Sequence, residues 1–162
     1  MKMKKRLASV LAAAVMAANF AIPAHAESDS ETKPMKNSSA KVSYSSTYWD
    51  QANFWDVWWG ANGNSKTIWY GANPYNADSI IHQNILSCSG IGSMSVGVSP
   101  SGPNASVSIS GHSATYSYSV SNNWRLEVNY NYKHTGLLAA WNYSTRASAT
   151  IQFGTQFYSW TT

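Results

Sequence analysis

Aromatic residues concentrate in one stretch of the chain, which reads YWDQANFWDVWWGANGNSKTIWYGAN over residues 48–73. Five of the eight tryptophans lie inside it. A short repeat lies there too, because Val57-Trp58-Trp59-Gly60-Ala61-Asn62 recurs eleven residues later as Ile68-Trp69-Tyr70-Gly71-Ala72-Asn73. The stretch is therefore the first candidate both for the core and for a binding surface.

The centre of this stretch predicts a β-hairpin. Asn62-Gly63 is a strong hairpin signal, since both residues adopt a positive φ at low cost. We expect two antiparallel strands, at 54–60 and 66–71, with facing rows of aromatic rings. Each cross-strand aromatic pair would contribute on the order of 0.2–1 kcal/mol beyond an Ala pair.

The first 26 residues have the pattern of a secretory signal peptide. A basic head that ends at Arg6 precedes an apolar run over 7–22, and Ala24-His25-Ala26 offers a cleavage site of small residues. The apolar run is too short and too rich in Ala for a membrane span. We therefore expect residues 1–26 to be removed and the protein to be secreted into the extracellular space.

Removal of this segment changes the charge balance. The chain has 11 Lys+Arg and 7 Asp+Glu, and four of the basic residues lie in the signal segment, which leaves 11 − 4 = 7 basic against 7 acidic. A nucleic-acid partner requires a basic patch that neutralises phosphates. Nucleic acid is therefore excluded as a partner, and electrostatic attraction to anionic lipid is not supported either.

The remaining residues are enough for one domain. Residues 27–41 are polar without apolar periodicity and predict a disordered tail, with a propeptide as the alternative. Residues 42–162 have few charges and few leucines but many Ser, Asn, Tyr and Trp. We expect a core built largely from aromatic rings, each of which buries roughly 150–250 Å².

Period-2 alternation after Gly92 predicts an antiparallel meander. The predicted strands lie at 93–99, 105–110, 114–120, 124–132, 145–153 and 155–160. The segment 78–88 fits either a short helix that Asp78 caps or a buried strand. With the hairpin, about seven to nine strands result, which indicates an all-β fold, either an antiparallel β-sandwich or a small barrel.

Titratable residues of the predicted domain form no recognisable catalytic arrangement. We expect Asp50 and Asp56 to cap turns or pair with Lys66 or an Arg, and Glu127 to form a surface ion pair with Arg125. The histidines lack zinc spacing, and no phosphate loop or G-x-S-x-G motif is present. Cys88 has no nucleophile signature and is expected to be a buried, inert thiol, with an intermolecular bridge as the alternative. The sequence therefore predicts no enzyme, no catalytic residues, no cofactor and no metal site.

Binding through aromatic rings is the function that the composition favours. Exposed Trp and Tyr rings stack on the apolar faces of sugars, and Asn and Asp bond their hydroxyls, so a cell-surface glycan or envelope component is the expected partner. The candidate ligand-binding residues are Trp55, Asp56, Trp58, Trp59, Asn62, Trp69, Tyr70 and Asn73. The alternative for each of these rings is a place in the core, since a domain poor in leucine needs rings there.

Two other functions are compatible with the sequence. A bacteriocin-like or pore-forming antimicrobial toxin would use Trp and Tyr at a membrane interface and would contact lipid. Its difficulty is length, because a membrane strand needs about 9–11 residues and most predicted strands are shorter. A self-assembling extracellular matrix component would use the weakly charged sheet edges to pair copies, so an oligomer also agrees with the sequence.

Overall fold

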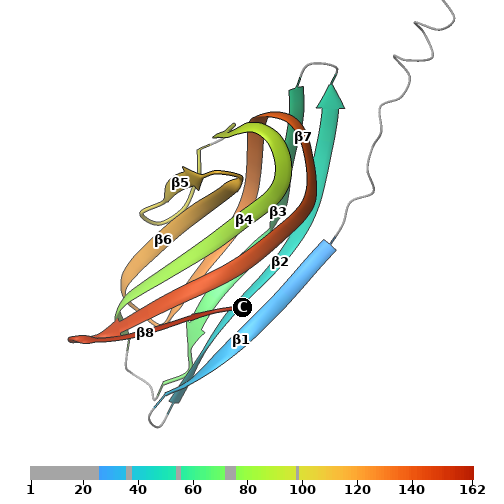
Figure 1. The fold of residues 1–162 in the computed structure, drawn as a ribbon. Helices are drawn as coiled ribbons and strands as arrows, with labels where there is room; N and C mark the ends of the chain where they lie inside the picture. Colours follow the sequence, from blue (N-terminus) through green and yellow to red (C-terminus); the bar gives the residue numbers. More distant parts are fainter. Residues whose placement is uncertain (1–25, 36–37, 54–55, 72–75, 98) are drawn as a thin grey trace, which may run out of the picture.

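The computed structural model describes residues 26–35, 38–53, 56–71, 76–97 and 99–162, which form one antiparallel sheet (Figure 1). Its strands are β1 (Ala26–Met35), β2 (Ser38–Asn53), β3 (Asp56–Trp69), β4 (Ala77–Val96), β5 (Ser106–Ser110), β6 (Ser113–Asn123), β7 (Arg125–Phe153) and β8 (Gln156–Thr161). They are ordered β1-β2-β3-β7-β4-β6-β5, and β8 pairs with β7. The all-β prediction and its strand number are confirmed, but the strands form one sheet rather than the two sheets of the predicted sandwich, and this sheet is not closed into a barrel.

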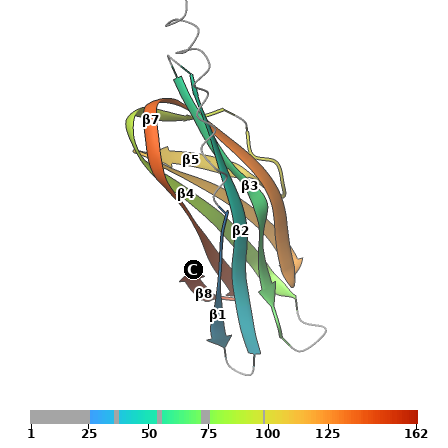
Figure 2. The ribbon, with the colours of Figure 1, turned by 90° about the vertical axis from the view of Figure 1, so that its right-hand side faces the viewer.

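The long strand β7 makes the sheet fold back on itself (Figures 1 and 2). Its residues 125–137 pair with β3, whereas residues 134–152 pair with β4. Gly136 and Gly92 lie where β7 and β4 change direction, and both have a positive φ, of 84° and 104°. Glycine adopts such angles without a steric penalty, which permits the bend. The half that contains β1, β2 and β3 consequently faces the half that contains β4 and β6.

Strand β3 corrects the hairpin prediction. It runs without a break from Asp56 to Trp69, so Asn62-Gly63 lies in the middle of a strand and the predicted turn between 54–60 and 66–71 is wrong. A Cβ on Gly63 would lie 1.8 Å from the carbonyl oxygen of Ser45. The glycine is therefore required for the close approach of β2 rather than for a turn.

The same strand separates the two copies of the repeat. They are eleven residues apart, an odd number, so corresponding side chains on one strand point to opposite faces of the sheet. Trp58 lies on the outer side, where Lys133 Nζ is 3.6 Å from its ring centroid. Its counterpart Trp69 packs on the inner side against Phe153, with ring centroids 4.7 Å apart.

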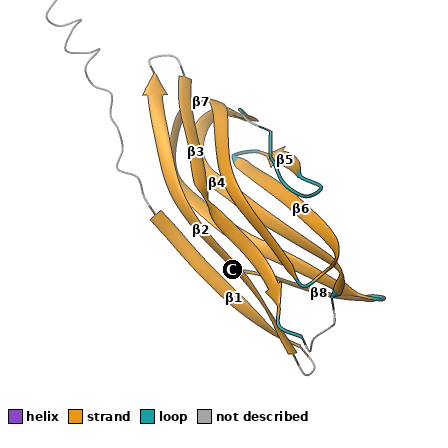
Figure 3. Cartoon of the chain, turned by 180° about the vertical axis from the view of Figure 1, so that it is seen from behind, coloured by secondary structure: helices purple, strands orange, loops and turns teal. Residues whose placement is uncertain are grey.

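Strand β1 replaces the predicted disordered tail. Residues 26–35 pair with β2 along their whole length, from Ala26 opposite Thr47 to Met35 opposite Ser38 (Figure 3). The Glu27 carboxylate accepts hydrogen bonds from the hydroxyls of Tyr44 (2.8 Å) and Tyr48 and from the amide of Thr145 (3.2 Å). These bonds bring β1 of one half close to β7 of the other. The predicted signal peptide lies outside the described residues, apart from Ala26.

The predicted meander is correct in where it places extended segments but not in how it divides or pairs them. Residues 93–96 are the end of β4 rather than a separate strand, and the predicted strands 124–132 and 145–153 are both part of β7. The segment 78–88 is part of β4, which decides against the helix alternative. β5 pairs with β6, and β7 pairs with β8, as hairpins. β6 and β7, however, follow each other in the chain without pairing, because β6 lies beside β4 and the first part of β7 lies beside β3.

The core between the two halves combines aromatic rings with polar side chains. Tyr132 stacks between Tyr116 and Tyr130, with ring centroids 3.6 and 4.5 Å away. Asn84 of β4 donates to the Tyr132 hydroxyl (2.9 Å) and to Ser65 of β3 (2.8 Å). The expectation of an aromatic core is confirmed, and hydrogen bonds between the halves satisfy several of the polar groups buried among the rings. Within the described ranges, no helix has the length and apolar character that crossing a membrane requires.

Candidate ligand-binding face

The structure does not gather the predicted site residues in one place. Trp58 and Asn62 share the outer side of β3, whereas Tyr70 is 54% exposed beyond the end of that strand. Trp59 and Trp69 point inward. Trp55 and Asn73 lie outside the described residues, and the side chain of Asp56 is not described either.

Trp59 belongs to the core. It is fully buried and stacks on His134 and Tyr143, with ring centroids 4.5 and 4.9 Å away. A ligand in solvent therefore cannot stack on this ring. Of the two roles that the sequence left open for Trp59, the structure supports the core ring over the ligand-binding ring.

A different set of polar and aromatic residues lies together on the outer side of β2, β3 and β7. The strand register places Trp49, Gly60 and Lys133 in one row across the three strands. The next rows along the strands contain Asn62 beside Asn131 and Asn64 beside Asn129. We call this surface the outer face, and its members are Trp49, Trp58, Asn62, Asn64, Asn129, Asn131 and Lys133.

Gly60 makes room for the Trp49 indole on this face. A Cβ at Gly60 would lie 2.6 Å from Cζ2 of Trp49 and 2.0 Å from the carbonyl oxygen of Tyr132. The ring therefore lies across the backbone of β3, and it reaches toward Lys133 on β7. The glycine of the first repeat copy serves ring packing, and the glycine of the second copy does so too, since a Cβ on Gly71 would lie 1.9 Å from the Trp69 ring.

The amides of the outer face are joined across the strands. Asn64 Nδ2 donates to Asn129 Oδ1 and to Glu127 Oε1, both at 2.9 Å. Glu127 also pairs with Arg125, as the sequence predicted. This network orients the Asn64 and Asn129 amides. Asn62 and Asn131 are exposed to solvent.

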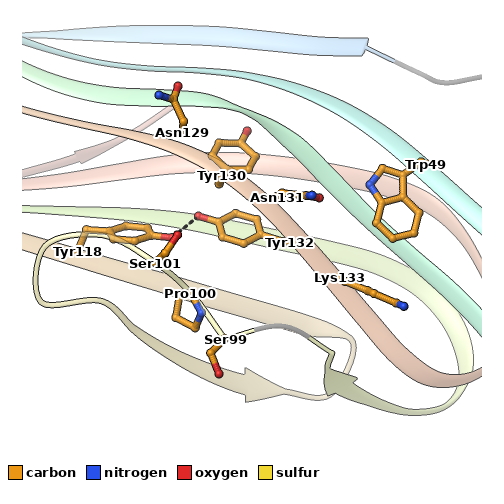
Figure 4. A pocket seen from close by; sticks show the side chains of 10 residues that line it. All are labelled: Trp49, Ser99, Pro100, Ser101, Tyr118, Asn129, Tyr130, Asn131, Tyr132 and Lys133. Carbon is orange, nitrogen blue, oxygen red and sulfur yellow. Dashed lines mark hydrogen bonds between the residues drawn. The ribbon is translucent and has the colours of Figure 1, made fainter.

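A cavity of about 580 Å³ adjoins the outer face at the edge of β7 (Figure 4). One wall is the loop 99–101. Just after this loop, the Pro103 carbonyl accepts a hydrogen bond from the Ser119 amide of β6 (3.1 Å). Figure 4 shows Trp49 and Lys133 toward one end and Tyr118 toward the other. The lining residues are Trp49, Ser99, Pro100, Ser101, Tyr118, Asn129, Tyr130, Asn131, Tyr132 and Lys133.

The lining offers rings, amides, hydroxyls and one ammonium group. Burial raises the pKa of Tyr130 to about 12 and also raises the pKa values of Tyr118 and Tyr132, so all three hydroxyls are neutral at physiological pH. Neutral hydroxyls and amides both donate and accept hydrogen bonds. A cavity with convergent groups of this kind suits a polar ligand that has an apolar face.

Titratable groups with other perturbed pKa values lie elsewhere. Burial lowers the pKa values of His82 and His134 to about 4, and burial raises the pKa of the Cys88 thiol to about 11. Asp50 accepts a hydrogen bond from Tyr143 (2.8 Å). In the part of the chain that the structure describes, no three His, Cys, Asp or Glu residues form a group that could hold a metal ion.

Sequence reasoning omitted Trp49, Asn64, Asn129, Asn131 and Lys133 from the candidate site. Alternation along 124–132 already places Asn129 and Asn131 on the side opposite the core. Their position beside β3 has no signal in the sequence, because it depends on a strand pairing between residues that lie about seventy positions apart.

Comparison of the chain with protein-family models, with curated proteins and with solved structures finds no match.

Proposed function

We propose that this is a secreted, non-enzymatic binding protein that holds a glycan or a similar polyhydroxylated component of the cell envelope at the outer face and the adjoining cavity. The observation that supports it most is the row of Trp49, Gly60 and Lys133, with Trp58 beside it and paired amides in the neighbouring rows. The binding residues in this proposal are partly those of the sequence hypothesis, since Trp58 and Asn62 are retained.

The chemistry of a sugar matches these groups. A pyranose ring has apolar C–H faces and a rim of hydroxyls. Trp49, whose ring lies close to Gly60, offers an indole for stacking, and stacked aromatic contacts contribute about 0.5–1.5 kcal/mol beyond the area that they bury. Asn62 and Asn131 are exposed beside the indole, where their amides pair with hydroxyls as donor and acceptor at once.

The lining of the cavity favours binding as the proposed role. Its ten residues include no carboxylate and no histidine. A glycosidase generally requires two carboxyl groups that flank the scissile bond, one of them as a general acid. The cavity therefore supports recognition of a glycan rather than its hydrolysis.

Substitution of the two outer-face indoles tests this function. We expect Trp49→Ala and Trp58→Ala each to lower the affinity for a bound glycan about tenfold, since a stacking surface is lost. Trp124→Ala is the matched control, because Trp124 is an exposed tryptophan just before β7 and is not a member of the outer face. Affinity electrophoresis and pull-down on peptidoglycan, chitin and cellulose provide the measurement. The proposal would be contradicted if both outer-face variants bound the polymers as strongly as the wild type. It would also be contradicted if the wild type bound none of the polymers.

A toxin that acts on membranes is the second candidate, and strand length favours it. β2, β3, β4 and β7 contain 16, 14, 20 and 29 residues. These lengths exceed the 9–11 residues or so that a membrane strand needs, so the objection raised by the short predicted strands no longer applies. At the bend of β4 and β7, Ile91, Leu138 and Trp141 are 56%, 68% and 45% exposed, and residues of this kind partition into a membrane interface.

Dye release from liposomes distinguishes the two functions. For a toxin, we expect leakage at low protein concentration, reduced by Leu138→Ser and Trp141→Ser but not by Trp49→Ala. For a glycan-binding protein, we expect no leakage from zwitterionic or anionic vesicles. Absence of leakage across these lipid mixtures would count against the toxin.

A further inference from the structure

We infer that the ligand of the outer face carries an anionic group, a carboxylate or a phosphate on a sugar or polyol chain, which binds Lys133 while the rest of the ligand contacts Trp49. This inference rests on the proposed function and narrows its ligand class. It starts from one fact about the cavity, namely that Lys133 is the single charged residue among the ten that line it.

The backbone of Lys133 is held on both sides. Lys133 pairs with Gly60 of β3, and its carbonyl accepts a hydrogen bond from the Gly97 amide (2.8 Å) just after β4. Its side chain is half-buried, with Nζ 3.6 Å from the centroid of the Trp58 ring. An aromatic face attracts an ammonium group but does not neutralise its charge or use its three N–H donors. The ammonium group is thus positioned and still able to bind an anion.

The described carboxylates nearest to this end of the outer face are already engaged, since Asp50, next to Trp49 on β2, accepts a hydrogen bond from the Tyr143 hydroxyl (2.8 Å). Among the described side chains, the ion pair is the one between Arg125 and Glu127, and it does not involve Lys133. Glu127 lies six residues from Lys133 along β7, which corresponds to about 20 Å in an extended strand. It is also already bonded to Asn64. Within the part of the chain that the structure describes, Lys133 therefore has no ion-pair partner.

The groups around Lys133 suit an oxyanion on a hydroxylated chain. Asn131, Ser99 and Ser101 line the same cavity, and their side chains are of the kinds that donate to an anionic oxygen or to a hydroxyl. A hydrogen bond that involves a charged partner is stronger than one between neutral groups. A ligand with an anionic substituent therefore uses the whole lining, whereas a neutral sugar leaves the ammonium group without a partner.

Two substitutions of Lys133 against three polymers test the inference. Lys133→Met removes the charge and keeps the aliphatic stem, and Lys133→Arg keeps the charge. The probes are hydroxyethyl cellulose as a neutral polymer, polygalacturonate as a carboxylate polymer, and poly(glycerol phosphate) as a phosphate polymer. Isothermal titration calorimetry at low and at high salt provides the affinities. Lys66→Met is the matched control. Lys66 is a lysine of β3 that lies opposite Glu127 in the strand register and does not line the cavity.

We expect Lys133→Met to weaken binding of an anionic polymer about tenfold at low salt and to leave binding of the neutral polymer unchanged. Lys133→Arg and Lys66→Met should stay within about threefold of the wild type, and added salt should weaken anionic binding. Preference for polygalacturonate or for poly(glycerol phosphate) identifies the source of the anion.

Three results would overturn the inference. Equal loss of neutral and anionic binding in Lys133→Met would mean that Lys133 only supports Trp58. Anionic polymers that bind no more tightly than the neutral polymer would refute the anionic ligand and leave the proposed function standing. Failure of the wild type to bind any of the three polymers or the envelope panel would remove the proposed function as well.

Discussion

At the scale of single residues, the missing side chain of Gly60 is as consequential as the rings around it. The position is not one where φ demands glycine, since Gly60 lies in an extended strand. Its requirement is spatial, because the Trp49 ring and the Tyr132 carbonyl both occupy the space of a Cβ. Glycine in a strand interior commonly marks such a close approach.

Gly60→Ala should therefore lower stability and displace the Trp49 ring. We expect a loss of about 1–3 kcal/mol in the free energy of unfolding, as for other overpacked sites, together with weaker glycan binding. Urea unfolding followed by tryptophan fluorescence provides the measurement. Gly111→Asn is the control, because a Cβ at Gly111 meets nothing within 4 Å and Asn tolerates its positive φ. An alanine variant as stable as this control would contradict the packing argument.

Cys88 illustrates how burial decides reactivity at the same scale. Its pKa is raised to about 11 by burial, so the thiolate fraction at pH 8 falls on the order of a hundredfold compared with an ordinary thiol. We expect correspondingly slow alkylation by iodoacetamide in the native protein and fast alkylation in urea. A native rate equal to the denatured rate would show that the thiol is accessible and active.

At the scale of elements, β1 depends on one carboxylate. Its ten residues are nearly all exposed, so apolar burial contributes little to its attachment. The ladder with β2 and the bonds of Glu27 to Tyr44, Tyr48 and Thr145 hold it in place. Charged hydrogen bonds of this kind contribute about 1.5–3 kcal/mol each when they are partly shielded from water.

Glu27→Ala should loosen β1 without unfolding the sheet. The substitution removes the acceptor of the Tyr44 hydroxyl and one partner of the Tyr48 hydroxyl, which keeps its bond to Thr145 (2.7 Å). We expect local opening of β1 to become easier by about 2 kcal/mol. Hydrogen exchange of the amides of residues 28–33 reports this opening. Glu31→Ala is the control, because the Glu31 side chain is exposed and its backbone carbonyl accepts the bond from Trp160 in either case (3.3 Å). Equal exchange rates in Glu27→Ala and Glu31→Ala would show that Glu27 does not hold β1 in place.

At the scale of the whole molecule, two neutral histidines lie inside the interface between the sheet halves. His82 of β4 bonds to Thr67 of β3 (2.8 Å), and His134 of β7 bonds to Tyr116 of β6 (3.0 Å). Both bonds join one half to the other. Burial of each imidazole lowers its pKa from 6.5 to about 4, because the charged form is poorly solvated there.

The stability of the fold should consequently fall in acid. Since the folded-state pKa lies below the unfolded one, the unfolded chain binds more protons between pH 6.5 and 4, and folding is weakened as the pH drops through that window. Each histidine contributes a loss of about 3 kcal/mol by pH 4. Unfolding curves between pH 7 and 4 should show this slope, and it should become shallower in His82→Gln and in His134→Gln. A slope unchanged in both variants would contradict the assignment.

Alternation along the chain correctly predicted which residues of β6 and β7 point inward, for example Tyr116, Tyr118 and Tyr132. This pattern is local, because successive side chains of any extended segment point to opposite sides. The turn at Asn62-Gly63 could not be decided in that way, since both residues accept turn and strand conformations alike. Pairing of β3 with β2 on one edge and with β7 on the other selects the extended form, through backbone hydrogen bonds along both edges.

The sequence by itself therefore determined the β class, the inward and outward positions of most strands, and the aromatic character of the core. Only the tertiary structure decided that residues 56–69 of the aromatic stretch form one strand, that residues 26–35 form β1, and that Trp49 shares a row with Lys133. The physical reason is the range of the interactions. Side-chain alternation is set by neighbours in the chain, whereas strand partners, bends and the cavity depend on contacts between residues far apart in it.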